Sequence, residues 1–191
     1  MDIAKYEDKV DYDVLIAACL LHDIGRKEQF EDPKVCHAAV GADKAYNYLI
    51  EHHWGHSDAQ EVKACIIAHR FRTDHIPESI ESKILFDADK LDVTGTLGIA
   101  RTLLYKGYVS EALYLLKEDG SVSDGSDDDK PSFFQEYKFK LENLYDKFYT
   151  RRGIELSIER QKSAVDFYNN MLREVRSSYA LGKEQLNIVY D

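Results

Sequence analysis

The fold is decided by the stretch VLIAACLLHDIGR, residues 14–26, where an apolar run ends on a histidine, an aspartate and a glycine. Apolar residues recur here three and four positions apart, which is the spacing of a buried helix face. Gly25 follows in a position that favours a left-handed helix cap. Adjacent side chains on a helix point about 100° apart, so His22 and Asp23 can serve one metal ion only near such an end. We expect a helix that ends at His22 and Asp23, two side chains of the types that can bind a metal ion.

Helical spacing continues along almost the whole chain. A second apolar stripe runs from Val35 to Leu49, and Asp58 with Glu61 forms a capping pair for a third helix. The inner face of this third helix would carry Val62, Cys65, Ile66 and His69. Further helices are expected from Pro77 to Leu91 (with Ile80, Ile84, Ala88 and Leu91 inward), over Thr94–Tyr105, Phe133–Tyr149 and Arg151–Tyr179. No β-hairpin signal interrupts this pattern, so the predicted class is all-α.

The length of 191 residues fits a single domain, residues 1–191, with a core of ordinary size. Hydrophobic residues make up 44% of the chain, as in other globular proteins. The segment EDGSVSDGSDDDKP, residues 118–131, is acidic and almost free of apolar residues, which predicts a mobile surface loop. This segment lacks the glycine-and-glutamate pattern of a calcium loop. Beyond it, residues 132–180 would form the C-terminal helices.

The net charge limits the classes of binding partner, and the cysteines indicate the cellular compartment. A formal net charge of −10 repels duplex phosphate and argues against general binding of duplex nucleic acid. A small phosphorylated substrate stays compatible, because a bound cation reverses the local field. The chain has no run of about 18 apolar residues, so no membrane span is expected. Cys19, Cys36 and Cys65 stand singly among apolar residues, which indicates reduced thiols and a cytoplasmic location.

Three further residues extend the histidine–aspartate pair. His37 lies in HAAVG, His69 in CIIAHRFR, and Asp89 in FDADKLD, each in a different predicted helix. A lone histidine on such a face is most often a core residue, and the pair alone arises often by chance. Helical bundles, however, build metal sites from inward-pointing histidines and carboxylates on facing helices. Asp87, two residues before Asp89, would point to nearly the opposite face of its helix.

These motifs resemble those of the HD-domain phosphohydrolases in order and spacing. The resemblance rests on LLHDIGR, HAAVG, the histidine of IIAHRFR and the run ILFDADKLDVTGTLGIART, and the last run looks closest to uncharacterised bacterial stand-alone members. It covers residues 12–106 and, weakly, the final helices. The resemblance implies an HD-domain-like helical bundle with one or two divalent metal ions. By motif, His22, Asp23 and Asp89 would be core ligands, and His37 and His69 would hold a second metal.

The activity implied by the resemblance is hydrolysis of a phosphate ester or anhydride, in a nucleotide or another small phosphorylated molecule. A divalent cation lowers the pKa of bound water from about 15.7 to near 7 and so supplies hydroxide at neutral pH. Asp23, if it bridges two ions, would help to place that hydroxide and is the candidate catalytic residue. The ligand set suits Mn, Fe, Ni, Zn or, less comfortably, Mg. Arg72, Lys90 and Arg101 are the candidate substrate-binding residues.

One departure from the family pattern leaves an alternative open. The family signature begins with another histidine on a preceding helix, and no histidine precedes His22 in this sequence. We therefore expect a chain that lacks this N-terminal helix and one metal ligand, with an exposed groove that could drive formation of a homodimer. The alternative function is a degenerate HD module that binds a nucleotide or a partner without turnover. A purely structural bundle is a third interpretation.

Overall fold

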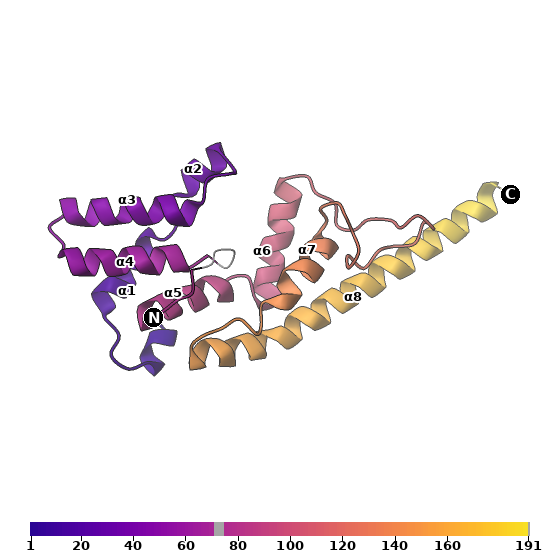
Figure 1. Ribbon diagram of the computed structural model, residues 1–191. Coiled ribbons are helices and arrows are strands. Elements are labelled where there is room, and N and C mark those ends of the chain that lie inside the picture. The colour runs from indigo at the N-terminus through magenta and orange to yellow at the C-terminus, as the bar shows by residue number, and fades with distance from the viewer. Residues whose placement is uncertain (71–74, 191) are drawn as a thin grey trace. The chain divides into compact units, whose positions relative to one another are not determined.

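The computed structural model describes residues 1–70 and 75–190, and in this part of the chain it contains helices, two isolated backbone bridges and no strand (Figure 1). The predicted all-α class is confirmed. The chain divides into two compact units. The first unit comprises Met1–Lys90 with Phe148–Ile154, and the second comprises Leu91–Lys147 with the chain from Glu155 onward. The expectation of a single domain stays a prediction.

The helices follow the predicted order, with differences at their ends. The elements are η1 Ile3–Tyr6, α1 Tyr12–Leu21, α2 Arg26–Glu31, α3 His37–Glu51, α4 His56–Ala68, α5 Ile80–Leu91, α6 Gly95–Tyr108, α7 Phe133–Phe139, η2 Leu141–Asn143 and α8 Arg151–Tyr190. The short helix α2 was not predicted, because its sequence RKEQFE has no apolar period. Asp58 does not cap α4, which begins two residues earlier and has Gly55 at its N-cap.

Two further expectations were wrong. The single helix predicted over Phe133–Tyr149 is broken, because α7 ends at Phe139 and only a short 3-10 turn follows. Ala88 is exposed, although it was expected to face inward, because α5 buries a stripe that includes Ile84 and Asp87 instead. Apolar spacing predicted that these segments are helical, but the packing of their neighbours determined where each helix stops and which face it buries.

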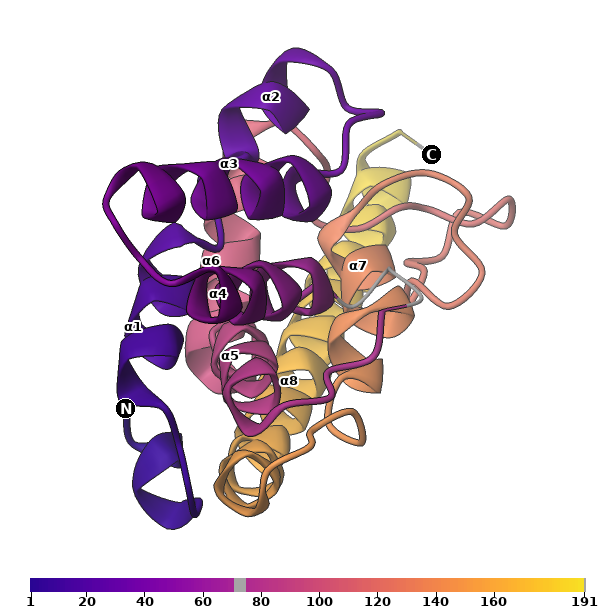
Figure 2. The same cartoon turned by 60° about the vertical axis from the view of Figure 1, so that its left-hand side comes forward.

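The core of the first unit is built on alanines. α3 and α4 run side by side, and α1 lies along α4 (Figures 1 and 2). Small side chains at the crossings let the helix backbones approach closely, while larger residues fill the remaining space. The buried cluster consists of Val14, Ala17, Ala18, Ala42, Ala45, Leu49, Ala59, Val62, Cys65, Ile66 and Leu85. Val62, Cys65 and Ile66 of the predicted third helix are therefore buried as expected.

Asp87 joins α5 to the start of α8 within the first unit. Its carboxylate is fully buried and accepts hydrogen bonds from the N–H groups of Tyr149 (3.0 Å) and Thr150 (2.7 Å) and from the Thr150 hydroxyl (2.6 Å). The Thr150 hydroxyl oxygen in turn accepts from the Gly153 N–H. These bonds satisfy backbone donors that the first turn of a helix otherwise leaves unpaired. Asp87 therefore has a structural role.

The core of the second unit is aromatic. The rings of Tyr137 and Tyr168 stack with centroids 3.9 Å apart, and Phe133 and Phe134 are fully buried beside them. The acidic segment 118–131 is anchored to this core through Val122, which is buried. The mobility of this segment stays a prediction. None of the helices described is long and apolar enough to cross a bilayer.

Candidate metal centre

His22 and Asp23 lie in the turn that follows α1. The last residue of the helix is Leu21, and the Ile24 N–H donates to the Leu21 carbonyl oxygen at 3.0 Å, which closes a tight turn around the pair. The two side chains consequently lie close together, with His22 Nε2 3.6 Å from Asp23 Oδ2. The prediction that this pair stands at the end of a helix is confirmed.

Gly25 serves this turn in a different way from the one predicted. Its φ is −91° and its ψ is 5°, so it is not a left-handed cap. Instead, a Cβ atom at Gly25 would lie 2.3 Å from the His37 carbonyl oxygen and 2.7 Å from the Gly41 nitrogen. Only a glycine lets the turn approach the first turn of α3 this closely. The glycines of HDIG and HAAVG therefore bring His37 to Asp23.

Three histidines are oriented in the same way. The Nδ1 atom of each is within hydrogen-bonding distance of an oxygen that can only accept, so Nδ1 carries the proton and Nε2 presents its lone pair. Such bonds fix the tautomer and the ring orientation of metal-binding histidines. The pairs are His22 with the Cys19 carbonyl oxygen (2.8 Å), His37 with the Gln29 side-chain oxygen (2.8 Å) and His69 with the Ile66 carbonyl oxygen (2.6 Å).

The free nitrogens of His37 and His69 converge on Asp23. The two Nε2 atoms are 3.3 Å apart, and Asp23 Oδ1 lies 3.6 Å from the first and 4.0 Å from the second. Within residues 1–70 and 75–190, this is the only group of three or more such side chains with all ligand atoms within 4.8 Å of one another. The ring of His22 lies beside it, with its centroid 5.2 Å from that of His69.

The spacing of these atoms suits a cation. Two lone pairs that face each other at 3.3 Å repel, unless a positive charge lies between them. Two nitrogens bound at about 2.05 Å to one tetrahedral ion would be about 3.3 Å apart. The Asp23 oxygen would need to move closer by a few tenths of an ångström, which the half-exposed Asp23 side chain permits. The donor set of two neutral imidazoles and one carboxylate therefore fits a divalent transition metal.

The electrostatics keep both histidines in the form that binds metals. Burial lowers the pKa of His37 to about 4, and the nearby Arg26 guanidinium and the His69 ring act in the same direction. Burial also lowers the pKa of His69. Both imidazoles are therefore neutral at pH 7, and no proton has to leave before a cation binds.

Asp89 lies beside this group and is held by Lys90. Burial alone would raise the pKa of Asp89, but the Lys90 ammonium and the rings of His69 and His22 together hold it below its ordinary value. Lys90 Nζ donates to Asp89 Oδ2 at 2.7 Å and to the His69 carbonyl oxygen at 3.1 Å, and it sits 4.7 Å from the centre of the Phe86 ring. Lys90 is buried. These contacts indicate that Lys90 positions Asp89 and His69.

The grouping differs from the one that the resemblance implied. There, His22, Asp23 and Asp89 would share one ion, while His37 and His69 would hold another. The structure brings Asp23 together with His37 and His69. Ligation by any of the five residues stays a prediction.

Two further candidate residues were predicted to bind substrate, Arg72 and Arg101. Arg72 lies outside the described residues. Arg101 belongs to α6 in the second unit, where it pairs with the Asp92 carboxylate, so its role in substrate binding also stays a prediction. Arg26, which follows the histidine–aspartate motif in sequence, donates from Nε to Asp23 Oδ1 at 2.8 Å. One contributor, Gln29, was missed from the sequence. It belongs to the unpredicted helix α2, and a recognised helix there would have been the sequence signal for it.

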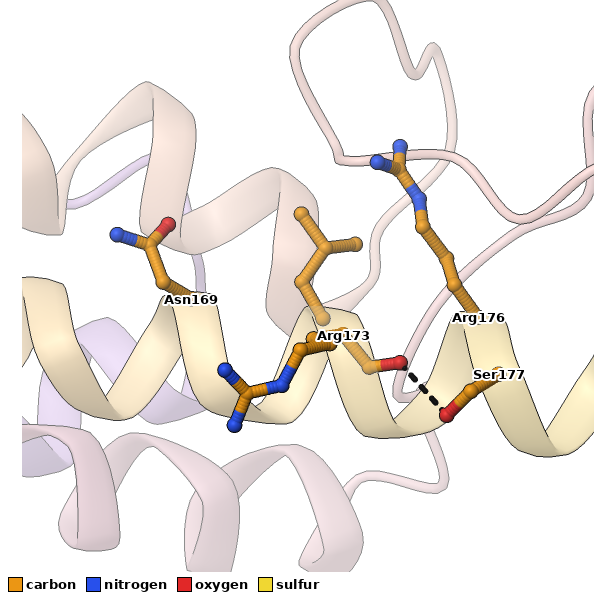
Figure 3. Close-up of a pocket in the computed structure, with 5 residues that line it drawn as sticks. Asn169, Arg173, Arg176 and Ser177 are labelled. Atoms are coloured by element: carbon orange, nitrogen blue, oxygen red, sulfur yellow. Dashed lines mark hydrogen bonds between the residues drawn. The ribbon is translucent and has the colours of Figure 1, made fainter.

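A shallow hollow on α8 offers a contrast. It measures about 490 Å³ and is lined by Asn169, Leu172, Arg173, Arg176 and Ser177 of the second unit (Figure 3). The Ser177 hydroxyl donates to the Arg173 carbonyl oxygen at 3.0 Å. The lining has no histidine, cysteine or carboxylate, so this hollow lacks the side chains that hold a transition-metal ion.

Comparison with known proteins relates the chain to the HD domain. Residues 1–94 match the family model of the HD domain. The uncharacterized protein YpgQ of Bacillus subtilis is 27% identical over 181 residues, which cover 91% of this chain and 80% of YpgQ. A predicted HD superfamily hydrolase from an uncultured Thermotogales bacterium superposes with a TM-score of 0.59 at 27% identity, covering 91% of this chain and 73% of its own. The crystal structure of YpgQ with ADP has a TM-score of 0.55 at 24% identity and covers 86% and 89% of the two chains.

Proposed function

We propose that this chain, whose residues 1–94 match the family model of the HD domain, is a metal-dependent hydrolase that cleaves a phosphate ester or anhydride bond. The observation that carries this proposal is the convergence of Asp23, His37 and His69, with both Nε2 atoms turned toward one point. A site of neutral imidazoles and a carboxylate is suited to a cation that activates water.

A nucleotide is the favoured class of substrate. The similar protein YpgQ has been crystallised with ADP, which supports a nucleoside phosphate as the molecule that this chain acts on. The acidic composition is compatible with a small anionic substrate, because a bound cation reverses the sign of the local field. A divalent ion, one or two in number, is the proposed cofactor.

When bound, the metal ion would supply hydroxide at neutral pH and neutralise charge that develops on phosphoryl oxygens. The residues of the chain prepare the place for it. His37, His69 and Asp23 would hold the ion, while the Ile66 carbonyl and the Gln29 amide keep the two imidazoles aimed at it. We assign His22 and Asp89 as further ligands or as groups that hold water beside the ion.

Arg26 would bind the substrate phosphate. Its side chain is half exposed, and its Nε donates to Asp23 at 2.8 Å, so a guanidinium stands at the edge of the proposed centre. Guanidinium groups bind phosphate oxygens in a bidentate manner. The sequence also made Lys90 a candidate for binding the substrate phosphate. The buried contacts of its ammonium instead favour a role in holding Asp89 and His69. Substrate binding by Arg72 and Arg101 is part of the same proposal.

The test is a metal and substrate screen. The protein is loaded separately with Mn²⁺, Fe²⁺, Ni²⁺, Zn²⁺, Co²⁺ or Mg²⁺ and incubated with nucleoside mono-, di- and triphosphates and with p-nitrophenyl phosphate esters. We expect metal-dependent release of phosphate or pyrophosphate that is lost in Asp23→Asn. An Asp43→Asn variant serves as a control, because Asp43 is an exposed aspartate of the first unit that pairs with Lys63.

The screen also separates the alternative function. Metal-dependent binding of a nucleotide without release of any product would overturn the hydrolase and support a binding module. Absence of metal uptake by elemental analysis would overturn the hydrolase, and absence of nucleotide binding as well would favour a purely structural bundle.

A further inference from the structure

The helix α2 has no buried residue of its own, although it occupies a fixed place between the His22–Asp23 turn and α3. Six residues without an apolar face do not form a stable helix by themselves. Its order comes instead from polar contacts on two sides. Glu28 forms an ion pair with Lys44 of α3, and Arg26 donates to Asp23. These two contacts hold α2 beside the candidate metal centre.

Gln29 points from α2 into that centre. Its side-chain oxygen is 2.8 Å from His37 Nδ1, and the side chain is partly buried. In the described part of the chain, His37 is the histidine of this group whose Nδ1 pairs with a side-chain oxygen. His22 and His69 instead pair through Nδ1 with backbone carbonyl oxygens.

The position of His37 explains why a side chain is needed. His22 and His69 each follow a helix, so the carbonyl oxygen three residues earlier lies within reach of Nδ1. His37 is the first residue of α3, and no helical turn precedes it to offer such an oxygen. An acceptor has to come from another element, and α2 supplies it.

We propose that Gln29 is the positioning residue that fixes the Nδ1–H tautomer of His37 and thereby aims His37 Nε2 at the metal ion. The proposal rests on the proposed metal centre, but not on the reaction that takes place there. Without Gln29, His37 can adopt the other neutral tautomer, in which Nε2 carries the proton.

The alternative tautomer has a ready partner. His69 Nε2 lies 3.3 Å from His37 Nε2, so a proton on His37 Nε2 would bond to the His69 lone pair. That bond would close the centre against a cation, because both nitrogens that face it would be engaged. Gln29 prevents this by accepting a hydrogen bond from Nδ1–H, and the Arg26 guanidinium, which donates to the same amide oxygen at 3.5 Å, keeps that oxygen turned to His37. Loss of such an orienting partner lowers metal affinity by about 10- to 100-fold in known sites.

The tautomer can be observed directly in the metal-free protein. Nitrogen-15 spectra of the histidine rings, recorded at pH 8 where a free imidazole is neutral, distinguish a protonated Nδ1 from a protonated Nε2. The His37 signals are identified by their loss in His37→Gln. We expect the Nδ1–H form in the native protein and in Gln29→Glu, which retains the acceptor, and the Nε2–H form in Gln29→Leu.

Metal affinity provides the second measurement. Competition titrations with Zn²⁺ and Co²⁺ should show a loss of about 10- to 100-fold in Gln29→Leu and a smaller change in Gln29→Glu. Lys27→Ala is the matched control, because Lys27 lies on the same helix and points into solvent. Circular dichroism checks that each variant is folded.

The outcomes are separable. If Gln29→Leu keeps the Nδ1–H form, or changes its tautomer without losing metal affinity, Gln29 does not have the proposed role. If the tautomer and the affinity both change while no phosphate ester is cleaved by any variant, the positioning role stands and the proposed hydrolase fails.

Discussion

Gly25 and Gly41 meet backbone to backbone, so closely that a Cβ atom on Gly25 would lie 2.7 Å from the Gly41 nitrogen. One glycine follows the histidine–aspartate pair, and the other lies one helical turn after His37. Their contact therefore fixes the distance between the two segments that carry Asp23 and His37, and several properties of the protein depend on it.

Gly25→Ala should damage both stability and the centre. The added methyl group would lie 2.3 Å from the His37 carbonyl oxygen, so the turn and α3 must separate. Overpacking of this kind lowers the free energy of unfolding by about 1–3 kcal/mol. Urea denaturation measures this loss. Gly107→Ala in α6 is the control, because its Cβ would meet nothing within 4 Å, and it should be neutral or stabilising. Equal stability of Gly25→Ala and the native protein would contradict the close contact.

Asp23→Asn should weaken metal binding by more than about 100-fold, because it removes the anionic charge beside two neutral imidazoles. Isothermal titration with Zn²⁺ measures the affinity, and elemental analysis measures the amount of metal retained on purification. The exposed Asp43 provides the control substitution, Asp43→Asn, which should bind metal normally. Retention of native affinity in Asp23→Asn would show that the carboxylate is not a ligand.

Lys90→Met should lower metal affinity without exposing the core. The substitution keeps a long apolar stem against Phe86 but removes the ammonium that bonds Asp89 and the His69 carbonyl. We expect a loss of about 10-fold or more in affinity for Zn²⁺, with partial recovery in Lys90→Arg. If nucleotide affinity falls while metal affinity stays the same, Lys90 contacts substrate as first predicted from the sequence.

Asp87→Ala should destabilise the first unit and leave the metal ligands in place. The change removes the acceptor of the Tyr149 and Thr150 N–H groups, and the Thr150 N–H is then left unpaired in a buried position. A loss of about 2–4 kcal/mol in unfolding free energy is expected when both hydrogen bonds are removed. Urea denaturation measures this loss, and titration of the folded variant with Zn²⁺ should still give native stoichiometry. A variant of native stability would exclude the structural role of Asp87.

Alkaline pH should destabilise the second unit through Tyr137 and Tyr168. Burial raises the pKa of both phenols, so the folded protein keeps protons that the unfolded chain releases above pH about 10. The unfolded state then binds fewer protons, and stability falls as the pH rises, by about 1.4 kcal/mol per pH unit for each phenol. In Tyr137→Phe the decline above pH 10 should be shallower by that amount. Parallel curves for the two proteins would contradict the burial of an ionisable phenol.

Much of the fold could be predicted from the sequence, because helical spacing is local. The apolar residues that precede His22, and those around Val62 and Ile66, specify buried helix faces whatever lies opposite them. Helix ends were less certain, since α4 begins before Asp58 and the segment after Phe139 leaves the helix. Those ends depend on caps and neighbours that are distant along the chain.

The types of residue in the candidate centre could also be predicted from the sequence. Helical spacing along the chain predicts the all-α class, and the motifs contain His22, Asp23, His37, His69 and Asp89 in the order of the resembling family. That Asp23 groups with His37 and His69, that Lys90 is buried, and that Gln29 reaches His37 became known from the packing of the helices. Spacing along a helix determines the face on which a side chain lies, whereas contact between helices depends on how closely their backbones approach. At this site, Gly25 and Gly41 set that approach.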